Sequence, residues 1–322
     1  MKRLSDVIQP LREKGISCQL QVSMMDFTTF RLGGLCPLLM HATTPSELQI
    51  AITLLHQYAL PFILIGGGSN LLVSDHGVDQ VVIRYVKDEP DIVIAPHETG
   101  AEVTVSGATS FDALALACCR AGLGQLALAS GIPGTVGGAV VGNAGAFGWQ
   151  IADALERVTT VDITGKMQEE HPETIGFSYR DSGLKGSDRY VASVTLRLPL
   201  EDQRDLLAKR DEILELRHQK HPDLETDPCA GSFFRNIEPT SKAERRQAAG
   251  HFLEEAGAKA MQEGGAGVFP RHANIIVKQT PACKAQDVYT LSKRMARAVQ
   301  EKFDLSLIRE VQALGHFDQP EL

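Results

Sequence analysis

The segment that most constrains the fold covers residues 130–148 and reads SGIPGTVGGAVVGNAGAFG, with seven glycines among nineteen residues. Glycine loses the most backbone entropy on folding, so a folded chain concentrates it where φ is positive or where the backbone must touch something. One interpretation is a loop whose bare N–H groups meet an anionic ligand such as a cofactor diphosphate. The other is a tight crossing of two packed elements. Composition alone leaves both interpretations open.

The glycine spacing matches neither standard phosphate-binding motif. A dinucleotide fingerprint needs Gly-x-Gly-x-x-Gly between a strand and a helix, and a Walker loop needs a lysine after its glycines. A second cluster, GGGSN at residues 66–70, follows an apolar strand predicted at residues 61–65 and also lacks a helical pattern after it. Two such loops in one domain favour a single extended ligand with a phosphate or nucleotide part.

The rest of the chain alternates between helical and strand patterns, which is typical of an α+β or an α/β fold. Thr44 and Glu47 form a capping box with Pro45 at the first helical position, so a helix is expected over residues 44–58. Strands and helices with weaker local signals follow. Helices are expected at residues 111–120, 201–219, 241–257 and 288–303, and strands at residues 81–83, 92–94, 102–106, 158–163 and 190–198.

Composition bounds the class of protein. A length of 322 residues suggests about two domains, and a formal net charge of −8 argues against sequence-independent nucleic-acid binding. No apolar run approaches the roughly 20 residues of a membrane helix, and the N-terminus lacks a secretory signal. The six cysteines include no Cys-x-x-Cys pair, which disfavours a metal site and fits a reducing compartment. We therefore expect a cytoplasmic protein without a metal, a membrane or a nucleic-acid partner.

Four polar residues are candidates for chemistry, each with a plainer alternative. Arg180, beside Asp181 in the sequence YRDS, is either half of a surface ion pair or a guanidinium aimed at a carboxylate or a developing oxyanion. Ser232 lacks the context of a nucleophile elbow, so it is either a turn serine or a proton donor in a dry site. Glu310 is either exposed or an acid in a pocket, and His272 is either a core residue or a phosphate ligand.

Eight short segments, taken together and in order, resemble the family of UDP-N-acetylenolpyruvoylglucosamine reductases, flavoenzymes of peptidoglycan precursor synthesis. Each segment alone is a weak signal, whereas the ordered set is highly specific. The segments are TFRLGG at residues 29–34, GGGSNLLVSD at 66–75, GIPGTVGG at 131–138, NAGAFG at 143–148, YRDS at 179–182, AGSFF at 230–234, HAN at 272–274 and EV at 310–311.

The resemblance implies an FAD-binding fold of the vanillyl-alcohol-oxidase type in two lobes, together with a smaller α+β domain for the substrate. Residues 1–200 would form the FAD-binding domain, with lobes at about 1–83 and 84–200. Residues 201–303 would form the substrate-binding domain, and residues 304–322 a C-terminal segment that returns to the active site. The short segment between Arg180 and Tyr190 indicates the subtype without a tyrosine-bearing insertion.

The resemblance also implies ligands and the residues that hold them. FAD would be bound without a covalent link, NADPH would donate the hydride, and UDP-N-acetylglucosamine enolpyruvate would accept it from flavin N5 in a protein expected to be a monomer. Arg180 and Glu310 would stabilise the resulting enolate, and Ser232 would donate the proton. The substrate would contact Tyr179, Lys220, Asn236 and His272. The cofactor would contact Gly66, Gly67, Gly68, Ser69, Asn70, Gly131, Ile132, Pro133, Gly134, Val136, Gly137, Gly138, Asn143, Ala144 and Gly145.

Two other classes of function stay open at this point. An FAD-dependent oxidase of the same fold, acting on a small alcohol or sugar acid, would need no proton donor opposite the flavin. A nucleotide-binding regulatory protein would bind the ligand without oxidising NADPH. The set of Arg180, Ser232 and Glu310 favours the reductase over the oxidase. NADPH oxidation that depends on the enolpyruvyl substrate would separate the reductase from the regulatory protein.

Overall fold

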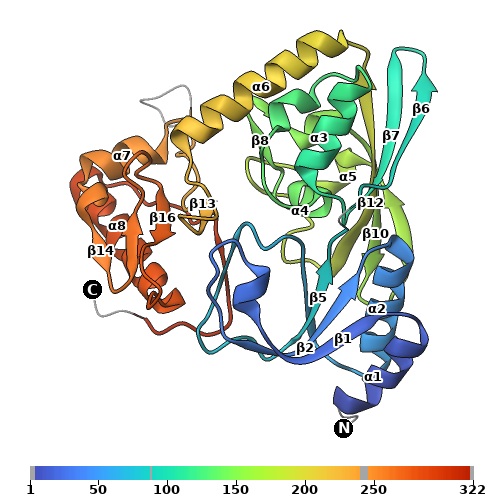
Figure 1. Ribbon diagram of the computed structural model, residues 1–322, viewed down its shortest axis with the longest axis horizontal. Coiled ribbons are helices and arrows are strands. Elements are labelled where there is room, and N and C mark those ends of the chain that lie inside the picture. The colour runs from blue at the N-terminus through green and yellow to red at the C-terminus, as the bar shows by residue number, and fades with distance from the viewer. Residues whose placement is uncertain (1–3, 88, 240–245, 320–322) are drawn as a thin grey trace. The chain divides into compact units, whose positions relative to one another are not determined.

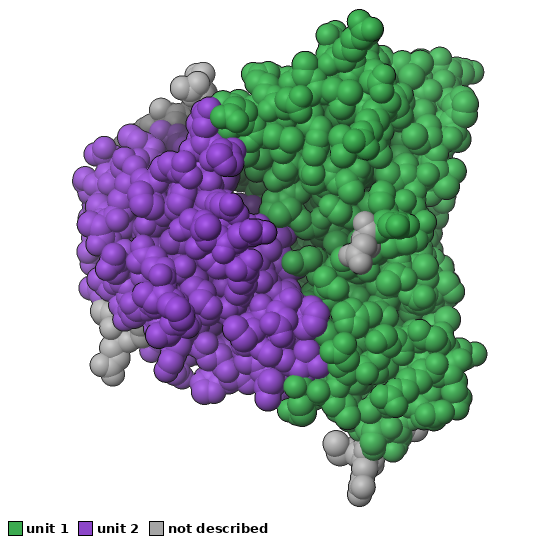
Figure 2. Space-filling view, viewed as in Figure 1, with its two compact units in different colours: residues 1–21, 37–67, 80–217 green, residues 22–36, 68–79, 218–322 purple. Residues whose placement is uncertain are grey.

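The computed structural model describes residues 4–87, 89–239 and 246–319. The chain divides into two compact units, drawn in separate colours in Figure 2. Unit 1 comprises residues 1–21, 37–67 and 80–217, and unit 2 comprises residues 22–36, 68–79 and 218–322. The units interleave along the sequence, whereas the domains expected from the sequence are consecutive. The assignment of FAD and substrate to particular domains stays a prediction.

The first sheet of unit 1 has the strand order β1-β2-β5-β3, and its strands β1, β2 and β5 are labelled in Figure 1. Strand β5 pairs in parallel with both β2 and β3. Two helices bury apolar side chains such as Leu11, Ile52 and Leu55 in the core beside this sheet. The elements are α1 (Leu4–Glu13), β1 (Ser17–Ser23), β2 (Leu35–Ala42), α2 (Pro45–Gln57), β3 (Phe62–Ile65) and β5 (Val81–Tyr85).

Helix α2 confirms the expected capping box. The Thr44 hydroxyl accepts a hydrogen bond from the Glu47 N–H at 3.2 Å, and Pro45 lies in the first turn. The Glu47 carboxylate in turn accepts from the N–H and the hydroxyl of Thr43, at 2.7 and 2.8 Å. In the usual capping box the glutamate side chain accepts from the N–H of the N-cap residue, which here is Thr44. Glu47 instead accepts from Thr43, the residue before the N-cap.

The second sheet of unit 1 is antiparallel, with the strand order β11-β10-β12-β7-β6. The Tyr85 hydroxyl at the end of β5 joins the two sheets, because it lies 2.8 Å from Ser106 Oγ and donates to Ala192 O at 2.7 Å. The further elements of this part are β6 (Ile92–His97), β7 (Gly100–Ser106), α3 (Phe111–Arg120), α4 (Val136–Val141), β8 (Gly145–Ala146), β9 (Trp149–Gln150), β10 (Leu155–Asp162), β11 (Met167–Glu170), α5 (Pro172–Ile175), β12 (Arg189–Pro199) and α6 (Gln203–Lys220).

Unit 2 has its own sheet, in the order β13-β16-β15-β14, and a separate parallel pair of β17 with β4. Helices α7 and α8 share one hydrophobic core with this sheet, which includes Phe233, Leu253 and Leu291. The elements are β4 (Leu71–Val73), β13 (Cys229–Ser232), α7 (Ala249–Glu255), β14 (Gln262–Glu263), β15 (Ala266–Val268), β16 (Ile275–Lys278), α8 (Ala285–Phe303) and β17 (Gln312–Leu314).

Most expected elements are confirmed, and two differ. The glycine-rich segment is a loop only as far as Thr135, after which α4 begins. The helix expected over residues 241–257 begins at Ala249, and the capping box proposed for Ser241 and Glu244 lies outside the described residues. In the described part of the chain, no helix combines the length and the apolarity that crossing a membrane requires.

Asp75 caps the long helix of unit 2 from a distant point in the sequence. Its carboxylate accepts from the N–H groups of Ala285 and Gln286, both at 2.9 Å, so two of the free donors at the start of α8 are satisfied. We expect Asp75→Ala to lower the free energy of unfolding by about 1–2 kcal/mol in urea titration. Asp79→Ala, at an exposed position of the same loop, is the control. Equal unfolding midpoints for the two variants would contradict the capping role.

Candidate functional site

The two glycine clusters meet in unit 1. A Cβ atom built at Gly66 would lie 2.4 Å from Thr135 Oγ1, and one at Gly67 would lie 3.4 Å from Gly134 Cα. The crossing of two packed segments, left open by the sequence, is therefore present. Only a residue without a side chain allows the approach at Gly66.

The same loops also offer bare hydrogen-bond donors. Within the residues that the structure describes, the N–H groups of Gly67 and Gly134 have no hydrogen-bond partner. Backbone N–H groups that are not used by the fold, on a surface without side chains, suit the phosphate oxygens of a nucleotide cofactor. The residues present therefore fit a diphosphate-bearing group such as FAD, and the crossing and the anion site are compatible readings of one segment.

Substitutions at Gly66 and Gly67 provide a matched test of whether these glycine loops bind FAD. Gly67→Ala adds a methyl group at ordinary contact distance from protein atoms, so we expect it to keep the stability of the FAD-free protein but to weaken FAD binding. Gly66→Ala collides with Thr135, so we expect it to lower the stability of the FAD-free protein itself. Fluorescence titration with FAD and thermal unfolding separate the two effects. FAD affinity unchanged in Gly67→Ala would contradict a cofactor at this position.

Asp112, in the first turn of α3, holds the start of the glycine-rich loop at residues 131–135. Its carboxylate accepts from the Gly131 N–H at 2.6 Å and from both terminal nitrogens of the Arg210 guanidinium at 2.7 and 2.8 Å. Burial opposes ionisation, but the hydrogen bonds from Arg210 and Gly131 keep the pKa of Asp112 below its ordinary value. Helix α6, which carries Arg210, thereby fixes the loop. Asp112 could not be predicted from the sequence, because its partners lie 19 and 98 positions away.

Arg180 lies at a turn of unit 1 with a positive φ of 54°. Its guanidinium donates to Asn143 O at 3.3 Å and to Gly145 O, and it covers the Tyr179 ring at 4.9 Å. The Asn143 side chain donates to Ser178 O at 2.8 Å and so fixes the same turn from the other side. The structure thus brings the predicted residues Tyr179 and Arg180 together with the predicted segment that contains Asn143, Ala144 and Gly145.

Ser232 and Glu310 come together in unit 2. Ser232 ends β13 and pairs with Ile275 of β16. The next carbonyl, that of Phe233, accepts from the Glu310 N–H at 2.8 Å. The two candidate residues, 78 positions apart in the sequence, are therefore carried by backbone segments that hydrogen-bond to each other.

Asn70, the last residue of the GGGSN segment, lies beside the backbone of Glu310. Its side-chain amide donates to Glu310 O at 3.2 Å, and its own carbonyl accepts from the Gln312 N–H at 2.9 Å. The chain turns at Gly68, which has a φ of +66°. The position requires glycine, because a Cβ there would lie 2.0 Å from Phe27 O. Ser69 lies between the two. Gly68, Ser69 and Asn70 thus belong to unit 2, whereas Gly66 and Gly67 belong to unit 1.

A group of basic residues surrounds His272 in unit 2. Its ring lies 5.6 Å from that of His221, and its Nδ1 accepts from the Asn274 N–H at 3.3 Å. Burial, together with the charges of Lys259 and Lys220, lowers the pKa of His272, so its imidazole is neutral near pH 7. Lys220 and His272, both predicted to contact substrate, therefore influence each other electrostatically. Asn236 Oδ1 instead accepts from the Ala249 N–H at 3.2 Å, at the start of α7.

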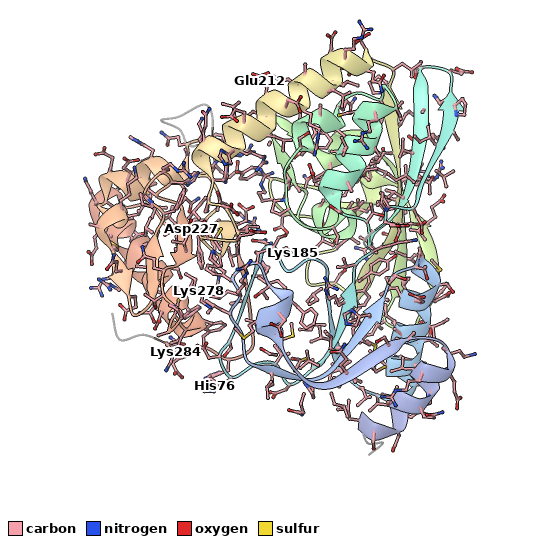
Figure 3. The ribbon with its side chains drawn as sticks, in the orientation of Figure 1. His76, Lys185, Glu212, Asp227, Lys278 and Lys284 are labelled. Carbon is pink, nitrogen blue, oxygen red and sulfur yellow. The ribbon has the colours of Figure 1, made fainter. Side chains whose placement is uncertain are left out.

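Lys278, labelled in Figure 3, is the last residue of β16. Its ammonium group donates to Arg31 O at 3.1 Å, and the Arg31 guanidinium donates to Glu225 O at 3.2 Å. The Thr29 hydroxyl in the same turn donates to Cys229 O at 2.7 Å. The turn at residues 28–34 is thus fixed to the strand that carries Ser232.

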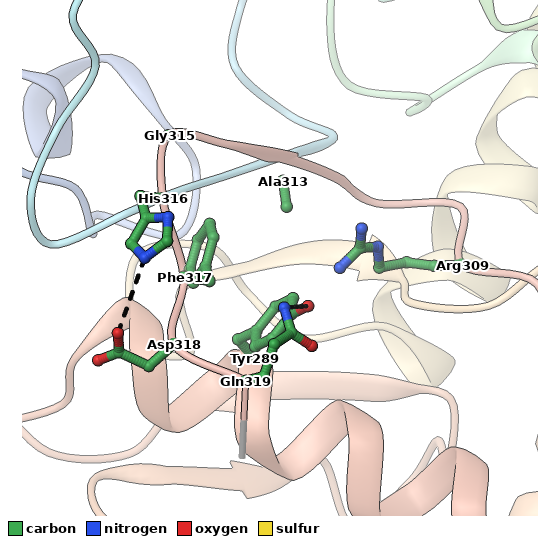
Figure 4. Close-up of a pocket in the computed structure, with 8 residues that line it drawn as sticks. All are labelled: Tyr289, Arg309, Ala313, Gly315, His316, Phe317, Asp318 and Gln319. Carbon is green, nitrogen blue, oxygen red and sulfur yellow. Dashed lines mark hydrogen bonds and ion pairs between the residues drawn. The ribbon is translucent and has the colours of Figure 1, made fainter.

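A cavity of about 440 Å³ lies beside the C-terminal segment of unit 2 (Figure 4). Tyr289 stacks on Phe317 in its wall, with ring centroids 4.7 Å apart, and the Arg309 guanidinium lies 5.5 Å from the Tyr289 ring. None of the predicted site residues lines this cavity. Its lining is Tyr289, Arg309, Ala313, Gly315, His316, Phe317, Asp318 and Gln319.

Two family models and several curated relatives match this chain. Residues 37–170 match the FAD binding domain model, and residues 222–314 match the model for the C-terminal domain of UDP-N-acetylenolpyruvoylglucosamine reductase. The reductase of that name from Trichormus variabilis is 36% identical over 311 residues, which cover 94% of this chain and 88% of the relative. The Bacillus velezensis reductase is 32% identical, with 97% and 99% covered.

A solved structure gives the same result at the level of the fold. The crystal structure of UDP-N-acetylenolpyruvylglucosamine reductase from Thermus caldophilus superposes with a TM-score of 0.73 at 31% identity, and the match covers 93% of this chain and 99% of that one. The FAD-binding fold with mixed α and β content, expected from the resemblance, is confirmed. The chain belongs to the family of UDP-N-acetylenolpyruvoylglucosamine reductases, FAD-dependent oxidoreductases of peptidoglycan precursor synthesis.

Proposed function

We propose that this protein uses bound FAD to reduce UDP-N-acetylglucosamine enolpyruvate to UDP-N-acetylmuramate, with NADPH as the hydride donor. The observation that carries the proposal is the hydrogen bond from the Glu310 N–H to the carbonyl of Phe233, the residue that follows Ser232. It occurs in a chain that matches these reductases over nearly their whole length. A hydroxyl and a carboxyl held by neighbouring backbone suit an addition that needs both a proton donor and stabilisation of negative charge.

The glycine loops and the segment at residues 143–145 would hold the cofactor. The chemistry that FAD supplies when bound is hydride transfer from the nicotinamide to the enolpyruvyl double bond. The bare N–H groups of Gly67 and Gly134 would contact its phosphate oxygens. The same role is proposed for the rest of the predicted set: Gly66, Gly68, Ser69, Asn70, Gly131, Ile132, Pro133, Val136, Gly137, Gly138, Asn143, Ala144 and Gly145.

Three side chains would act on the substrate. Ser232 would donate a proton from Oγ to the carbon next to the carboxylate, because that carbon carries the developing negative charge. The guanidinium of Arg180 would bind the carboxylate as it takes up that charge, and its bonds to Asn143 O and Gly145 O would orient it. The Glu310 carboxyl would stabilise the same enolate by sharing its proton.

Lys220 and His272 would bind the nucleotide-sugar part of the substrate. The positive charges of Lys220 and Lys259, near the neutral imidazole of His272, would attract its phosphate groups. Tyr179 would pack its ring on the substrate, and Asn236 would donate from its side-chain amide. The cytoplasm is the compartment that fits NADPH and a nucleotide sugar. We propose that the protein acts there as a monomer.

Two measurements on the purified protein test this proposal. The protein should be yellow, with flavin absorbance that is released on denaturation. NADPH oxidation should depend on added UDP-N-acetylglucosamine enolpyruvate and should continue when oxygen is removed. A folded protein that binds FAD but consumes NADPH only in the presence of oxygen would contradict the proposal and favour an oxidase of the same fold.

A further inference from the structure

The buried residue Asn274 holds the backbone that carries Ser232. It lies immediately before β16 and has an exposed fraction of only 2%. Its main-chain carbonyl accepts from the Phe233 N–H at 2.8 Å. Its side chain extends the same pairing by one residue, because Oδ1 accepts from the Phe234 N–H at 3.0 Å and Nδ2 donates to Phe234 O at 2.8 Å. The side-chain amide of Asn274 thus satisfies both the backbone N–H and the backbone carbonyl of Phe234.

The other edge of the same short segment holds Glu310. The Phe233 carbonyl accepts from the Glu310 N–H at 2.8 Å, and the Arg235 N–H donates to Ile308 O at 2.8 Å. Phe234 and Arg309 form an antiparallel bridge between these bonds. Residues 232–235 therefore lie between Asn274 on one side and residues 308–310 on the other. A shift of this segment would move Ser232 and Glu310 together.

Chemistry restricts position 274 to a group that both donates and accepts. The Phe234 N–H needs an acceptor and the Phe234 carbonyl needs a donor, and both Phe233 and Phe234 are buried, with exposed fractions of 0% and 4%. Water is therefore a poor substitute if the amide is lost, and a buried backbone group without a partner is costly. A carboxylate at this position would accept from the N–H but would repel the carbonyl oxygen.

We propose that Asn274 is a positioning residue for the reduction step: it holds the Ser232 hydroxyl and the Glu310 carboxyl in the geometry that protonates the substrate carbon. This inference rests on the proposed function. Asn274 itself touches neither ligand in this account, since it acts through the peptide groups of Phe233 and Phe234. A misplacement of about 1 Å at a reacting group is enough to slow a reaction about 100-fold.

The two half-reactions of the enzyme separate this role from general stability. Asn274→Ala should slow reoxidation of the reduced flavin by UDP-N-acetylglucosamine enolpyruvate about 10- to 100-fold in stopped-flow absorbance. Reduction of the flavin by NADPH should stay within about twofold of the wild-type rate, because it needs neither Ser232 nor Glu310. The matched control is Ser292→Ala, which removes another buried side-chain bond of unit 2, from Ser292 Oγ to Tyr289 O at 2.7 Å. The control should leave both rates unchanged.

Asn274→Asp gives a second, independent readout, which also serves if the alanine variant does not fold. A protonated carboxyl can accept from the Phe234 N–H and donate to its carbonyl, as the amide does, whereas the ionised form cannot donate. Reoxidation in this variant should therefore be near wild-type at low pH and should fall as pH rises through the pKa of the introduced carboxyl, which burial places above about 4. Neither the wild-type protein nor Ser292→Ala should show this additional loss.

Three results are informative. Equal slowing of both half-reactions in Asn274→Ala, or an Asn274→Asp variant with the pH profile of the wild-type protein, would overturn the positioning role and leave the proposed function standing. Wild-type protein whose reduced flavin is not reoxidised by the substrate would overturn the proposed function, and the inference with it. Selective slowing together with the new pH dependence would support both.

Discussion

Replacing Ser232 with alanine is expected to slow reoxidation of the reduced flavin by the enolpyruvyl nucleotide sugar by about 100-fold or more. The reason is that the variant lacks the hydroxyl that would protonate the substrate carbon, whereas the backbone pairing of β13 with β16 does not use that side chain. Reduction of the flavin by NADPH has no such proton transfer to the substrate and should keep its wild-type rate. Anaerobic stopped-flow absorbance measures both rates on the same preparation.

A control for this variant comes from the segment that precedes Glu310. Ser306 is exposed, and its hydroxyl donates to the Gln300 side chain at 2.8 Å. Ser306→Ala should leave both half-reactions unchanged. If Ser232→Ala slows both half-reactions equally, Ser232 is not the proton donor, and its effect on rate is one of folding or cofactor binding.

Arg180→Lys is expected to lower the rate of the same half-reaction by about 100- to 1000-fold, the range found when a donor to a developing oxyanion is removed. Arg180 donates to Asn143 O and Gly145 O, and the planar fork of a guanidinium matches the two oxygens of a carboxylate. A lysine keeps the charge but presents it at one point, so it cannot hold the loop and bind a carboxylate in two places at once. Single-turnover reoxidation with saturating substrate measures this loss.

Arg189→Lys is the matched control for Arg180→Lys. Arg189 also lies in unit 1, donates to a backbone carbonyl, that of Gly183, at 3.0 Å, and pairs with Glu170. It has no proposed part in the reaction, so its substitution should change the stability of the protein but not the rate of reoxidation. Similar rates for the two variants would show that Arg180 acts only as a structural arginine.

Elements with local signals could be predicted from the sequence. Helix α2 follows from Thr44, Pro45 and Glu47, and α3 has the expected bounds, Phe111–Arg120. Helix α4 could not be predicted from the sequence, because its glycines, Gly137 and Gly138, favour a loop. Gly137 is needed there for a tertiary reason, since a Cβ would lie 3.1 Å from Gly107 O. Thr135, whose hydroxyl accepts from the Gly138 N–H at 3.3 Å, is the local signal that could have revealed this helix.

The candidate site shows the same limit at the level of single residues. The resemblance named the side chains proposed to meet ligands, such as Ser232 and Glu310, because they lie in recognisable segments. It did not name Asp112 or Asn274 as supports, because their partners are up to 98 positions away and are mostly backbone groups. The interleaving of the two units, in which residues 22–36 and 68–79 group with the C-terminal part, has the same cause. Pairings such as that of β4 with β17 leave no local pattern.

The central claim is that this chain passes electrons from its flavin to an enolpyruvyl nucleotide sugar. The most direct test reduces the FAD-loaded protein with one equivalent of NADPH without oxygen and then adds UDP-N-acetylglucosamine enolpyruvate. We expect the oxidised flavin spectrum to return and one equivalent of UDP-N-acetylmuramate to form for each flavin. A flavin that stays reduced with this substrate, yet is reoxidised when air is admitted, would contradict the account.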